Sequence, residues 1–367
     1  MSARVHTLFI TGATGLVGRG VLERMLRADL SLRAYALVRG ETARQHLLAS
    51  LGSLASHVTP VKGDLRRRGL GIDYAVRRAL TREVTHVVHA AADTSFSQSL
   101  AQARMVNTEG TRELLSLCRA FGALRRFAYV STSYVAGRAI GRILERDNGV
   151  TAGWVNAYER SKYEAETLVR DCHLDWVIFR PSTIVCDSVE GRVSQLNAVH
   201  RALKVYSRGL AAMIPGGRDD RLDVVPADYV SGAISRIVLD PRAAGSTLHL
   251  CAGEGAMPLG DLLDSAYELW ARDPLWRKRG VERAVLTDLA TYSLFTDSVI
   301  ETGDQRLASI LQSLSHFVPQ LALPKRFDTS FADALADGPA PAVHTYWTTM
   351  LEQLVAFNWS GSRTEAA

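Results

Sequence analysis

The sequence predicts an α/β protein whose centre is a doubly wound parallel sheet. Short apolar segments alternate with segments of helical spacing through the first half of the chain. The strand-like segments are apolar throughout rather than at every second position, which indicates strands covered on both faces. With 367 residues, of which 47% are apolar and 22% charged, the chain is long enough to bury a core of this kind.

Six strands and the helices between them follow one another as far as residue 185. Each strand-like segment is followed by a stretch with helical periodicity. His86 and His89 fall within the fourth strand, so we expect packed side chains rather than metal ligands. The expected strands are 5–11, 33–40, 58–65, 84–91, 125–135 and 174–185, and the expected helices are 16–29, 41–56, 73–83, 103–122 and a helix that contains 157–166.

The alternation stops after Val185. Residues 194–213 hold one expected helix, 222–240 and 246–253 return to the sheet edge, and the chain beyond 255 is mainly helical. We therefore expect a dinucleotide-binding core in residues 1–185, completed by about 222–252. A smaller substrate-binding or lid region is expected from 186–221 and 253–358, with a flexible tail at 359–367.

A glycine-rich turn, TGATGLVG, joins the first strand to the first helix. Gly12 permits a tight turn, Gly15 lets the backbone approach a pyrophosphate, and Gly18 allows the helix to pack closely on the strand. The first N–H groups of the helix and its positive dipole end suit phosphate. Because the turn stands at the first of several strand–helix units, it predicts a dinucleotide site in a Rossmann-type core.

The residues after the second strand bear on which dinucleotide binds. Val38 and Arg39 stand where an NAD-binding chain would place Asp or Glu against the ribose 2′-hydroxyl. A guanidinium at that point fits a 2′-phosphate, so NADP(H) is favoured over NAD(H).

Tyr158 and Lys162 lie four residues apart on an expected helix and so share one face. A free tyrosine, with a pKa of about 10, is a poor proton donor at neutral pH, and a nearby ammonium lowers that pKa. The fifth strand ends in YVST, which brings a hydroxyl to the same edge of the sheet. Tyr163 is expected to point elsewhere, and the solvated face of the helix is expected to hold Glu159, Arg160, Glu164 and Glu166.

Other classes of site find little support. The net charge is +5, and the arginine run 66–68 has no interleaved aromatic residues, so we interpret it as a solvated loop rather than a nucleic-acid site. No apolar run approaches the roughly 18 residues of a membrane span, and the N-terminal residues lack a signal-peptide pattern. The dispersed histidines indicate no metal site. The scattered cysteines predict reduced, mostly buried thiols in a cytoplasmic protein: Cys118, Cys172, Cys186 and Cys251.

Taken together, these motifs resemble those of the extended short-chain dehydrogenases/reductases over about residues 5–252. The matching segments are TGATGLVG, GDL at 63–65, HAAA at 89–92, VNTEGT at 106–111, YVST at 129–132, YERSK at 158–162 and RPSTIV at 180–185. The resemblance implies a catalytic set of Thr132, Tyr158 and Lys162, with Ser131 and Ser133 as neighbouring hydroxyls. The cofactor contacts that it implies are Gly12, Thr14, Gly15, Leu16, Val17, Gly18, Arg39, Asp64, Leu65, Ala90, Ala91, Ala92, Asn107, Tyr158, Lys162, Pro181, Ser182, Thr183 and Ile184.

Within that family the chain looks most like the thioester reductase and fatty acyl-CoA reductase (male-sterility-like) branch. The segments that carry this likeness are AADTSF at 91–96, GRVSQLNA at 191–198, RLDVVPADYVSGAI at 221–234 and SHFVPQLALPKRFD at 315–328. The likeness implies reduction of an acyl thioester, on coenzyme A or a carrier protein, to aldehyde or alcohol by NADPH, with Tyr158 as proton donor. Homodimers through surface helices are common in the family. Candidate acyl-pocket residues are Trp270, Trp276, Phe295, Phe317 and Phe327.

Three alternatives stay open. The first is an NADPH-dependent reductase of a small ketone or aldehyde in secondary metabolism. A nucleotide-sugar epimerase-like or dehydratase-like enzyme fits less well, because Ser133 and Tyr134 replace the acidic pair of the dehydratases and Arg39 replaces an NAD-binding acid. A non-catalytic NADP-sensing protein would not need the Tyr158–Lys162 pair.

Overall fold

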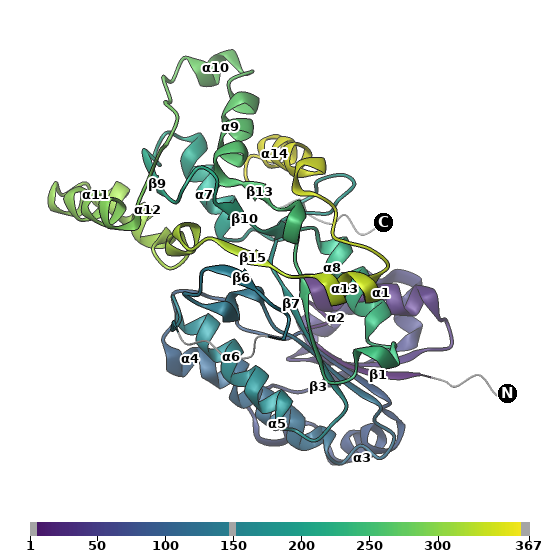
Figure 1. Cartoon of the computed structure of the whole chain (residues 1–367). Coiled ribbons are helices and arrows are strands. Elements are labelled where there is room, and N and C mark those ends of the chain that lie inside the picture. Colours follow the sequence, from purple (N-terminus) through teal and green to yellow (C-terminus); the bar gives the residue numbers. More distant parts are fainter. Residues whose placement is uncertain (1–5, 147–151, 361–367) are drawn as a thin grey trace.

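The computed structural model describes residues 6–146 and 152–360, and a seven-stranded parallel sheet forms its centre (Figure 1). The strand order is β12-β7-β5-β4-β1-β2-β3, and every neighbouring pair is parallel. This confirms the predicted α/β class. The sheet strands are β1 (Thr7–Thr11), β2 (Arg33–Val38), β3 (Val58–Lys62), β4 (His86–His89), β5 (Arg126–Val130), β7 (Trp176–Pro181) and β12 (Ser246–Leu250).

Helices connect these strands and cover both faces of the sheet (Figure 1). The winding reverses between β1 and β4, because β2 and β3 lie on one side of β1 while β4 and all later strands of the sheet lie on the other. In folds of this kind ligands bind at the carboxyl ends of the strands beside such a reversal. The connecting helices are α1 (Leu16–Ala28), α2 (Glu41–Leu51), α3 (Tyr74–Glu83), α4 (Leu100–Asn107), α5 (Glu109–Cys118), α6 (Ala157–Arg170) and α8 (Ala227–Ile237).

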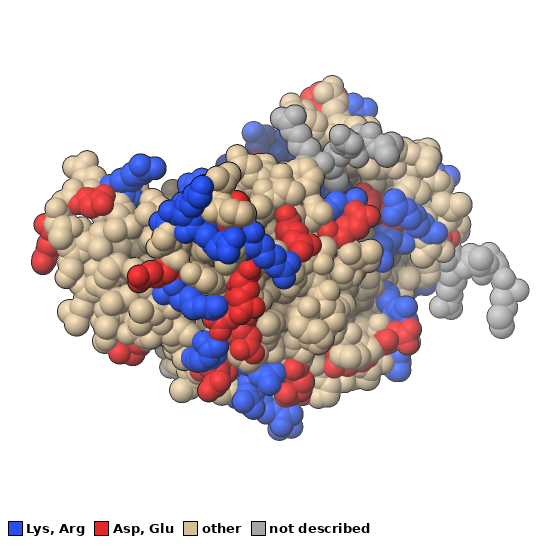
Figure 2. Space-filling model, turned by 90° about the horizontal axis from the view of Figure 1, so that it is seen from above, with Lys and Arg blue, Asp and Glu red and all other residues tan. Residues whose placement is uncertain are grey.

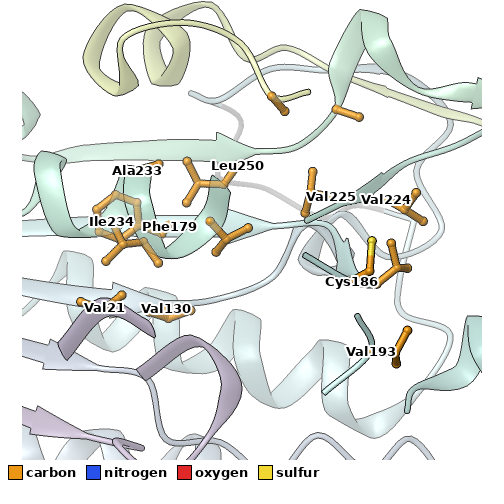
Figure 3. Close-up of a cluster of buried hydrophobic side chains, with 14 of the residues drawn as sticks. Val21, Val130, Phe179, Cys186, Val193, Val224, Val225, Ala233, Ile234 and Leu250 are labelled. Carbon is orange, nitrogen blue, oxygen red and sulfur yellow. The ribbon is translucent and has the colours of Figure 1, made fainter. Parts of the chain in front are cut away.

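Alternate side chains of each strand enter two different hydrophobic cores. Leu8 and Ile10 of β1 pack into the larger core, which α1 and α8 share, and Phe9 packs into the smaller one with α3, α5 and α6. Figure 3 shows part of the larger core, to which β7 contributes Phe179 and α8 contributes Ile234. The strands are apolar throughout because both of their faces are buried.

Several predicted segments differ from the observed elements. The helix expected over 41–56 ends at Leu51, and a 3-10 helix follows it from Gly52. Residues 222–240, expected at the sheet edge, instead hold the short strand β11 (Val224–Val225) outside the central sheet and the helix α8.

The single helix expected over 103–122 is divided at Thr108 into α4 and α5. The Thr108 hydroxyl donates to the Ser161 carbonyl at 3.0 Å, which draws the chain toward α6 at this point. The helix expected over 194–213 is shorter, α7 (Ala198–Ser207), and it begins after Asn197 because Asn197 and His200 cap its first turn reciprocally.

The mainly helical C-terminal region is joined to the core by short strand pairs. β15 (Lys325–Phe327) runs parallel to β6 (Gly141–Ile143), and α11 (Leu289–Glu301) and α12 (Gln305–Leu314) project to one side (Figure 1). Trp359, at the start of the expected tail, packs on Trp270 with ring centroids 5.9 Å apart, and residues 361–367 of that tail lie outside the described residues.

Short strands and further helices make up the rest of the C-terminal region and its junction with the core. The short strands are β8 (Thr183–Ile184), β9 (Met213–Pro215), β10 (Arg221–Leu222), β11 (Val224–Val225), β13 (Met257–Pro258) and β14 (Val285–Thr287). The helices are α9 (Leu259–Trp270), α10 (Pro274–Arg277), the 3-10 helix η6 (Val318–Ala322), α13 (Ser330–Ala336) and α14 (Trp347–Ala356).

Several predictions from composition are confirmed by burial. All four cysteines are buried and unpaired, His86 and His89 are buried, and the arginines at 66–68 are exposed. On the face in Figure 2, basic and acidic side chains interleave between broad uncharged areas. Within residues 6–146 and 152–360, no helix is long and apolar enough to cross a bilayer, and no three His, Cys, Asp or Glu side chains gather as a metal site would require.

Candidate active site

The glycine turn between β1 and α1 forms a cradle that side chains would fill. Gly12 has a φ of +75°, and a Cβ on it would lie 2.6 Å from the Ala91 nitrogen. A Cβ on Gly18 would lie 2.2 Å from the Gly12 carbonyl oxygen. Gly15, the N-cap of α1, is exposed and provides no side-chain cap for the first N–H groups of the helix. These donors and the close backbone fit a dinucleotide pyrophosphate.

A cavity of about 610 Å³ lies beside this turn at the carboxyl ends of the sheet strands. Most of the predicted site residues line it: Gly15, Leu16, Val17, Gly18, Ala90, Ala92, Thr132, Tyr158, Lys162, Pro181, Ser182, Thr183 and Ile184. The structure brings these residues together from five separate segments of the chain. The predicted residues that do not line the cavity are Gly12, Thr14, Arg39, Asp64, Leu65, Ala91 and Asn107.

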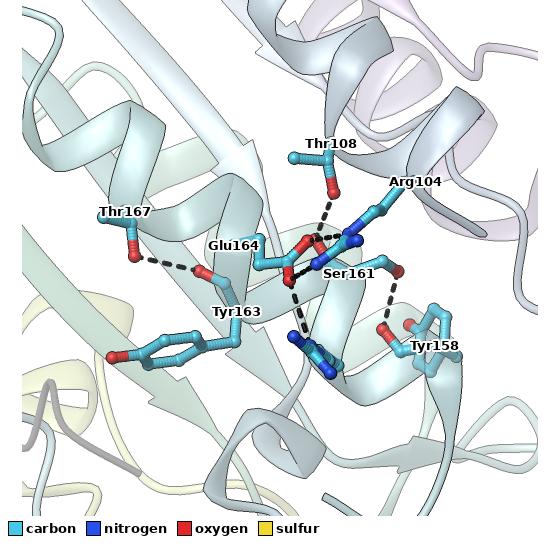
Figure 4. Close-up of polar contacts among 8 residues, drawn as sticks. Arg104, Thr108, Tyr158, Ser161, Tyr163, Glu164 and Thr167 are labelled. Carbon is cyan, nitrogen blue, oxygen red and sulfur yellow. Dashed lines mark hydrogen bonds and ion pairs between the residues drawn. The ribbon is translucent and has the colours of Figure 1, made fainter. Parts of the chain in front are cut away.

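Helix α6 presents Tyr158 to this cavity from its first turn. The Asn156 side chain caps the helix by accepting from the Glu159 N–H at 3.0 Å. The Tyr158 ring packs against Phe96 with ring centroids 5.4 Å apart. Tyr163 points away on another side of the helix, as predicted (Figure 4), and packs against Trp154 instead. Only one of the two phenols on this helix therefore faces the cavity.

Burial controls the protonation of Tyr158. Loss of solvent raises its pKa above the ordinary value, and the neighbouring Thr132 hydroxyl acts in the opposite direction. Burial therefore outweighs the lowering that the Tyr158–Lys162 spacing predicted. A phenol with a raised pKa keeps its proton at neutral pH, which suits a proton donor better than a base.

Lys162 is almost fully buried behind Tyr158, with 1% of its surface exposed. Its ammonium donates to the Val130 carbonyl oxygen at 2.7 Å and lies 4.1 Å from the centre of the Tyr129 ring. Burial lowers the pKa of Lys162 to about 7, and the Glu166 carboxylate counteracts part of that effect. The ammonium is thus held at the end of β5, next to Thr132.

Glu166 is buried, which corrects the prediction that it lies on the solvated face of α6. The Arg180 guanidinium of β7 donates to both of its oxygens at 2.9 and 2.7 Å, and Arg170 donates to one at 2.6 Å. Burial alone would raise the pKa of Glu166, but Arg180 and Arg170 lower it to about 2. Sequence reasoning missed this contact because Arg180 belongs to another element.

Glu159 is also buried, again contrary to the prediction of a solvated face. Its carboxylate accepts from the Val155 N–H at 2.8 Å and from the Gln320 amide at 2.6 Å. Lys325 donates to the Gln320 amide oxygen at 2.9 Å. Burial raises the pKa of Glu159 to about 7. The residue after Tyr158 therefore ties α6 to the C-terminal region. Arg160 is exposed, as expected, whereas Glu164 is half-buried and pairs with Arg104 and Arg160.

Asn107 does not line the cavity, and its side-chain amide forms hydrogen bonds with other groups of the protein. Its nitrogen donates to the Asp93 carbonyl at 3.0 Å and to the Ser161 hydroxyl at 2.9 Å, and its oxygen accepts from the Asp93 N–H at 2.8 Å. The side chain is 1% exposed. Asn107 thus holds the loop after β4 against α6.

Arg39 and Asp64 follow the adjacent strands β2 and β3. Arg39 is exposed, and Asp64 is half-buried. A hydrogen bond from Arg66, with 2.6 Å between Nη2 and Oδ2, is the main cause that lowers the pKa of Asp64 to about 2, and the Arg39 charge contributes in the same direction. Arg39 is therefore a cation available to a ligand at this edge of the sheet.

Some cavity residues were not predicted as site residues, although the motifs AADTSF, GRVSQLNA and SHFVPQL contain most of them. Among the five aromatic pocket candidates, Phe317 lines the cavity, whereas Trp270, Trp276 and Phe327 are buried in cores and Phe295 is half-buried on α11. The additional lining residues are Asp93, Thr94, Ser95, Phe96, Ser97, Val130, Ser131, Tyr134, Gln195, Leu196, Asn197, Ala198, Arg201, Ser313, Leu314 and His316.

The sequence of the chain matches the model of the NAD-binding family described as "Male sterility protein" over residues 10–234. The chain belongs to this family. It is an NAD(P)-dependent oxidoreductase, and the predicted likeness to the thioester reductase and fatty acyl-CoA reductase branch is confirmed. The family model thus supports a nicotinamide cofactor, and the cradle at Gly12, Gly15 and Gly18 fits one.

The chain is also similar to individual proteins of named activity. The chain is 31% identical over 286 residues to an isonitrile lipopeptide synthase of Mycobacterium tuberculosis, and 23% identical over 273 residues to the fatty acyl-CoA reductase wat of Drosophila melanogaster. These matches cover 67% and 62% of the chain but only 11% and 53% of the relatives.

One similar solved structure is the terminal R domain of the myxalamid PKS-NRPS biosynthetic pathway. It is 26% identical to the chain with a TM-score of 0.78, and the match covers 98% of the chain and 93% of that domain. The similarity therefore extends through the C-terminal region, beyond the residues that the family model matches.

Proposed function

We propose that the chain is an NADPH-dependent reductase of an acyl thioester carried on coenzyme A or on a carrier protein. The observation that supports this most directly is the convergence of Thr132, Tyr158 and Lys162 on one cavity beside the glycine cradle. The named activity of one relative, a fatty acyl-CoA reductase, supports a thioester substrate, because coenzyme A carries acyl groups as thioesters.

The cofactor would be held by the glycine cradle and by Pro181 to Ile184 on the far wall of the cavity. When bound, its reduced nicotinamide supplies a hydride to the carbonyl carbon of the substrate. The exposed Arg39 guanidinium would pair with the 2′-phosphate, which is why we propose NADPH rather than NADH.

The polar side chains of the cavity would manage the charge on the substrate oxygen. As the carbonyl carbon gains an electron pair, negative charge develops on this oxygen, and the Thr132 and Tyr158 hydroxyls would stabilise it by donating hydrogen bonds. Tyr158 then transfers its proton to the oxygen, for which its raised pKa keeps it protonated. With a thioester, the resulting hemithioacetal loses the thiol as the carbon–sulfur bond breaks, and an aldehyde is left. A second reduction in the same site would give the alcohol.

Tyr158→Phe tests this role, with Tyr163→Phe as the matched control on the same helix. We expect Tyr158→Phe to lower kcat by about 10²–10⁴-fold with little change in NADPH affinity, because only the proton donor is removed. Tyr163→Phe should retain activity, since its ring packs on Trp154 away from the cavity. An active Tyr158→Phe enzyme would overturn the assignment.

The substrate class is tested by stoichiometry. The protein is incubated with dodecanoyl-CoA, NADPH and a thiol-reactive dye. One thiol released for every one or two NADPH consumed would support thioester reduction, to aldehyde or alcohol respectively. NADPH consumption with small ketones or aldehydes but not with thioesters would instead support a carbonyl reductase.

A further inference from the structure

A buried histidine links the first strand to the fifth helix at the edge of the sheet where the glycine cradle begins. His89, the last residue of β4, is 1% exposed. Its Nδ1 lies 2.7 Å from the Thr11 hydroxyl of β1, and its Nε2 lies 3.0 Å from the Thr111 hydroxyl of α5. Thr11 and Thr111 are also buried. Both ring nitrogens of His89 are therefore bonded within the protein interior.

The hydroxyl hydrogens fix the direction of these two bonds. The Thr111 hydroxyl donates to the Asn107 carbonyl oxygen at 2.6 Å, so it can only accept from His89. His89 therefore carries its proton on Nε2, and its Nδ1 accepts from the Thr11 hydroxyl. Burial and the nearby charge of Lys162 lower the pKa of His89 to about 3, so the ring keeps this neutral form at neutral pH.

On the Nδ1 side, the hydrogen bonds reach the glycine cradle. The Thr11 hydroxyl oxygen accepts from the Ala91 N–H at 3.3 Å, and Thr11 directly precedes Gly12. The Ala91 nitrogen is the atom that a Cβ on Gly12 would approach to 2.6 Å. His89 thus holds the hydroxyl that sets the spacing between the glycine turn and the loop after β4.

On the Nε2 side, the hydrogen bonds reach the helix of the proposed proton donor. Asn107, whose carbonyl accepts from Thr111, donates from its side-chain nitrogen to the Ser161 hydroxyl at 2.9 Å. Ser161 in turn donates to the Tyr158 carbonyl oxygen at 2.8 Å in the first turn of α6 (Figure 4). Asn107 and Ser161 are buried. A continuous series of buried hydrogen bonds therefore joins His89 to the backbone of Tyr158.

We propose that His89 is a positioning residue that couples the cofactor cradle to the helix that carries Tyr158. Its two ring nitrogens act on different partners. The bond at Nδ1 keeps the cradle in the form that binds the dinucleotide, and the bond at Nε2 keeps Tyr158 in place at the substrate oxygen. The second effect rests on the proposed function of Tyr158 as proton donor, whereas the first concerns NADPH binding alone.

Two amide substitutions separate the two bonds. Asparagine places its side-chain oxygen near the position of Nδ1, and glutamine places its amide N–H near that of Nε2, so each variant keeps one bond. His89→Asn should lower kcat with dodecanoyl-CoA about tenfold and keep the affinity for NADPH, measured by fluorescence titration, within about twofold. His89→Gln should lower the affinity for NADPH about tenfold and keep kcat at saturating NADPH within about twofold.

His86→Gln is the matched control. His86 is a buried histidine of the same strand, and its Nδ1 lies 2.9 Å from the Thr85 hydroxyl at the opposite end of β4. Its replacement removes a buried imidazole but none of the bonds that lead to the cradle or to α6. NADPH affinity and kcat should both stay within about twofold of wild type.

Thr11→Val and Thr111→Val test the same two bonds where a His89 variant fails to fold, because each removes one hydroxyl with little change in shape. Thr11→Val should repeat the loss of NADPH affinity, and Thr111→Val should repeat the loss of kcat. The proposal is overturned if both variants of a pair lose affinity and kcat equally, or if neither variant changes either quantity.

The NADPH titration separates this inference from the proposed function. A wild-type protein that reduces no thioester would refute the proposed function. The role of His89 would then be decided by binding alone: a weaker affinity for NADPH in His89→Gln than in His89→Asn would keep it, and equal affinities would refute it. Thioester reduction by wild type with the same kcat and NADPH affinity in both variants would refute the role of His89 and keep the proposed function.

Discussion

Replacement of Glu166 by Gln should destabilise the protein more than any other single carboxylate-to-amide change on α6. Glu166 is fully buried, and its two oxygens accept hydrogen bonds from Nε and Nη2 of the Arg180 guanidinium. An amide offers only one acceptor oxygen, so one donor of a buried cation would lose its partner. Breaking a buried ion pair by changing one member typically costs about 3–5 kcal/mol.

The shift in the pKa of Glu166 gives a similar value for its contribution to the free energy of unfolding. The folded protein lowers it from 4.5 to about 2, which corresponds to roughly 3 kcal/mol at about 1.4 kcal/mol per pKa unit. Because the folded-state pKa is depressed, this stabilisation is present above about pH 4.5 and is lost as the pH falls toward 2. The difference in stability between wild type and Glu166→Gln should therefore shrink over that interval.

Urea unfolding at neutral pH, with Glu164→Gln as the control, measures the effect. Glu164 pairs with Arg104 and Arg160, is 23% exposed and lies on the same helix, so its loss should cost under about 1 kcal/mol. With a denaturant slope of about 3 kcal/mol/M, Glu166→Gln should lower the urea midpoint by about 1 M. The reasoning is wrong if Glu166→Gln unfolds at the same urea concentration as Glu164→Gln.

Three further predictions concern the cradle, the cofactor and the link to the C-terminal region. Gly12→Ala should abolish NADPH binding or folding, because its Cβ would lie 2.6 Å from backbone, whereas Gly40→Ala, with nothing within 4 Å, should bind normally by fluorescence titration. Arg39→Ser should lower the affinity for NADPH about tenfold and leave the affinity for NADH nearly unchanged in the same titration. An equal loss of affinity for both dinucleotides would exclude a contact between Arg39 and the 2′-phosphate. Glu159 has a folded-state pKa raised to about 7, so its contribution to stability falls as pH rises from about 4.5 to 7. Relative to Glu159→Gln, wild type should lose up to roughly 3 kcal/mol over that range in urea unfolding; a constant difference would contradict the burial of this carboxylate.

The sequence contained enough information to predict the sheet and the position of the candidate site. Apolar strands and glycine turns act through local geometry, and the carboxyl ends of parallel strands meet at one edge by topology alone. Gly12 and Gly18 illustrate this, because the backbone contacts that require glycine are formed by the turn itself and by the strand beside it.

Contacts between distant elements could not be predicted in the same way. Glu159 and Glu166 belong to a polar stretch whose pattern is that of an exposed helix face, and their partners Gln320 and Arg180 are supplied by other segments. The ammonium of Lys162 likewise depends on the end of β5, where the Val130 carbonyl accepts its hydrogen bond. Spacing along one helix identifies the residues that share a face but not what packs against that face.

The hydrogen bond from Gln320 to Glu159 also limits how the chain can be divided. The two residues are 161 positions apart, and the Glu145 carboxylate accepts from the Ala332 N–H across 187 positions. A fragment that stops before residue 320 would retain the whole glycine cradle but leave a carboxylate beside Tyr158 without its amide partner. Chimaeras that exchange the C-terminal region to alter substrate choice therefore need to keep Gln320 and Lys325 with α6. An exchange that omits them could displace Tyr158, the proposed proton donor, and that displacement would be mistaken for a change in specificity.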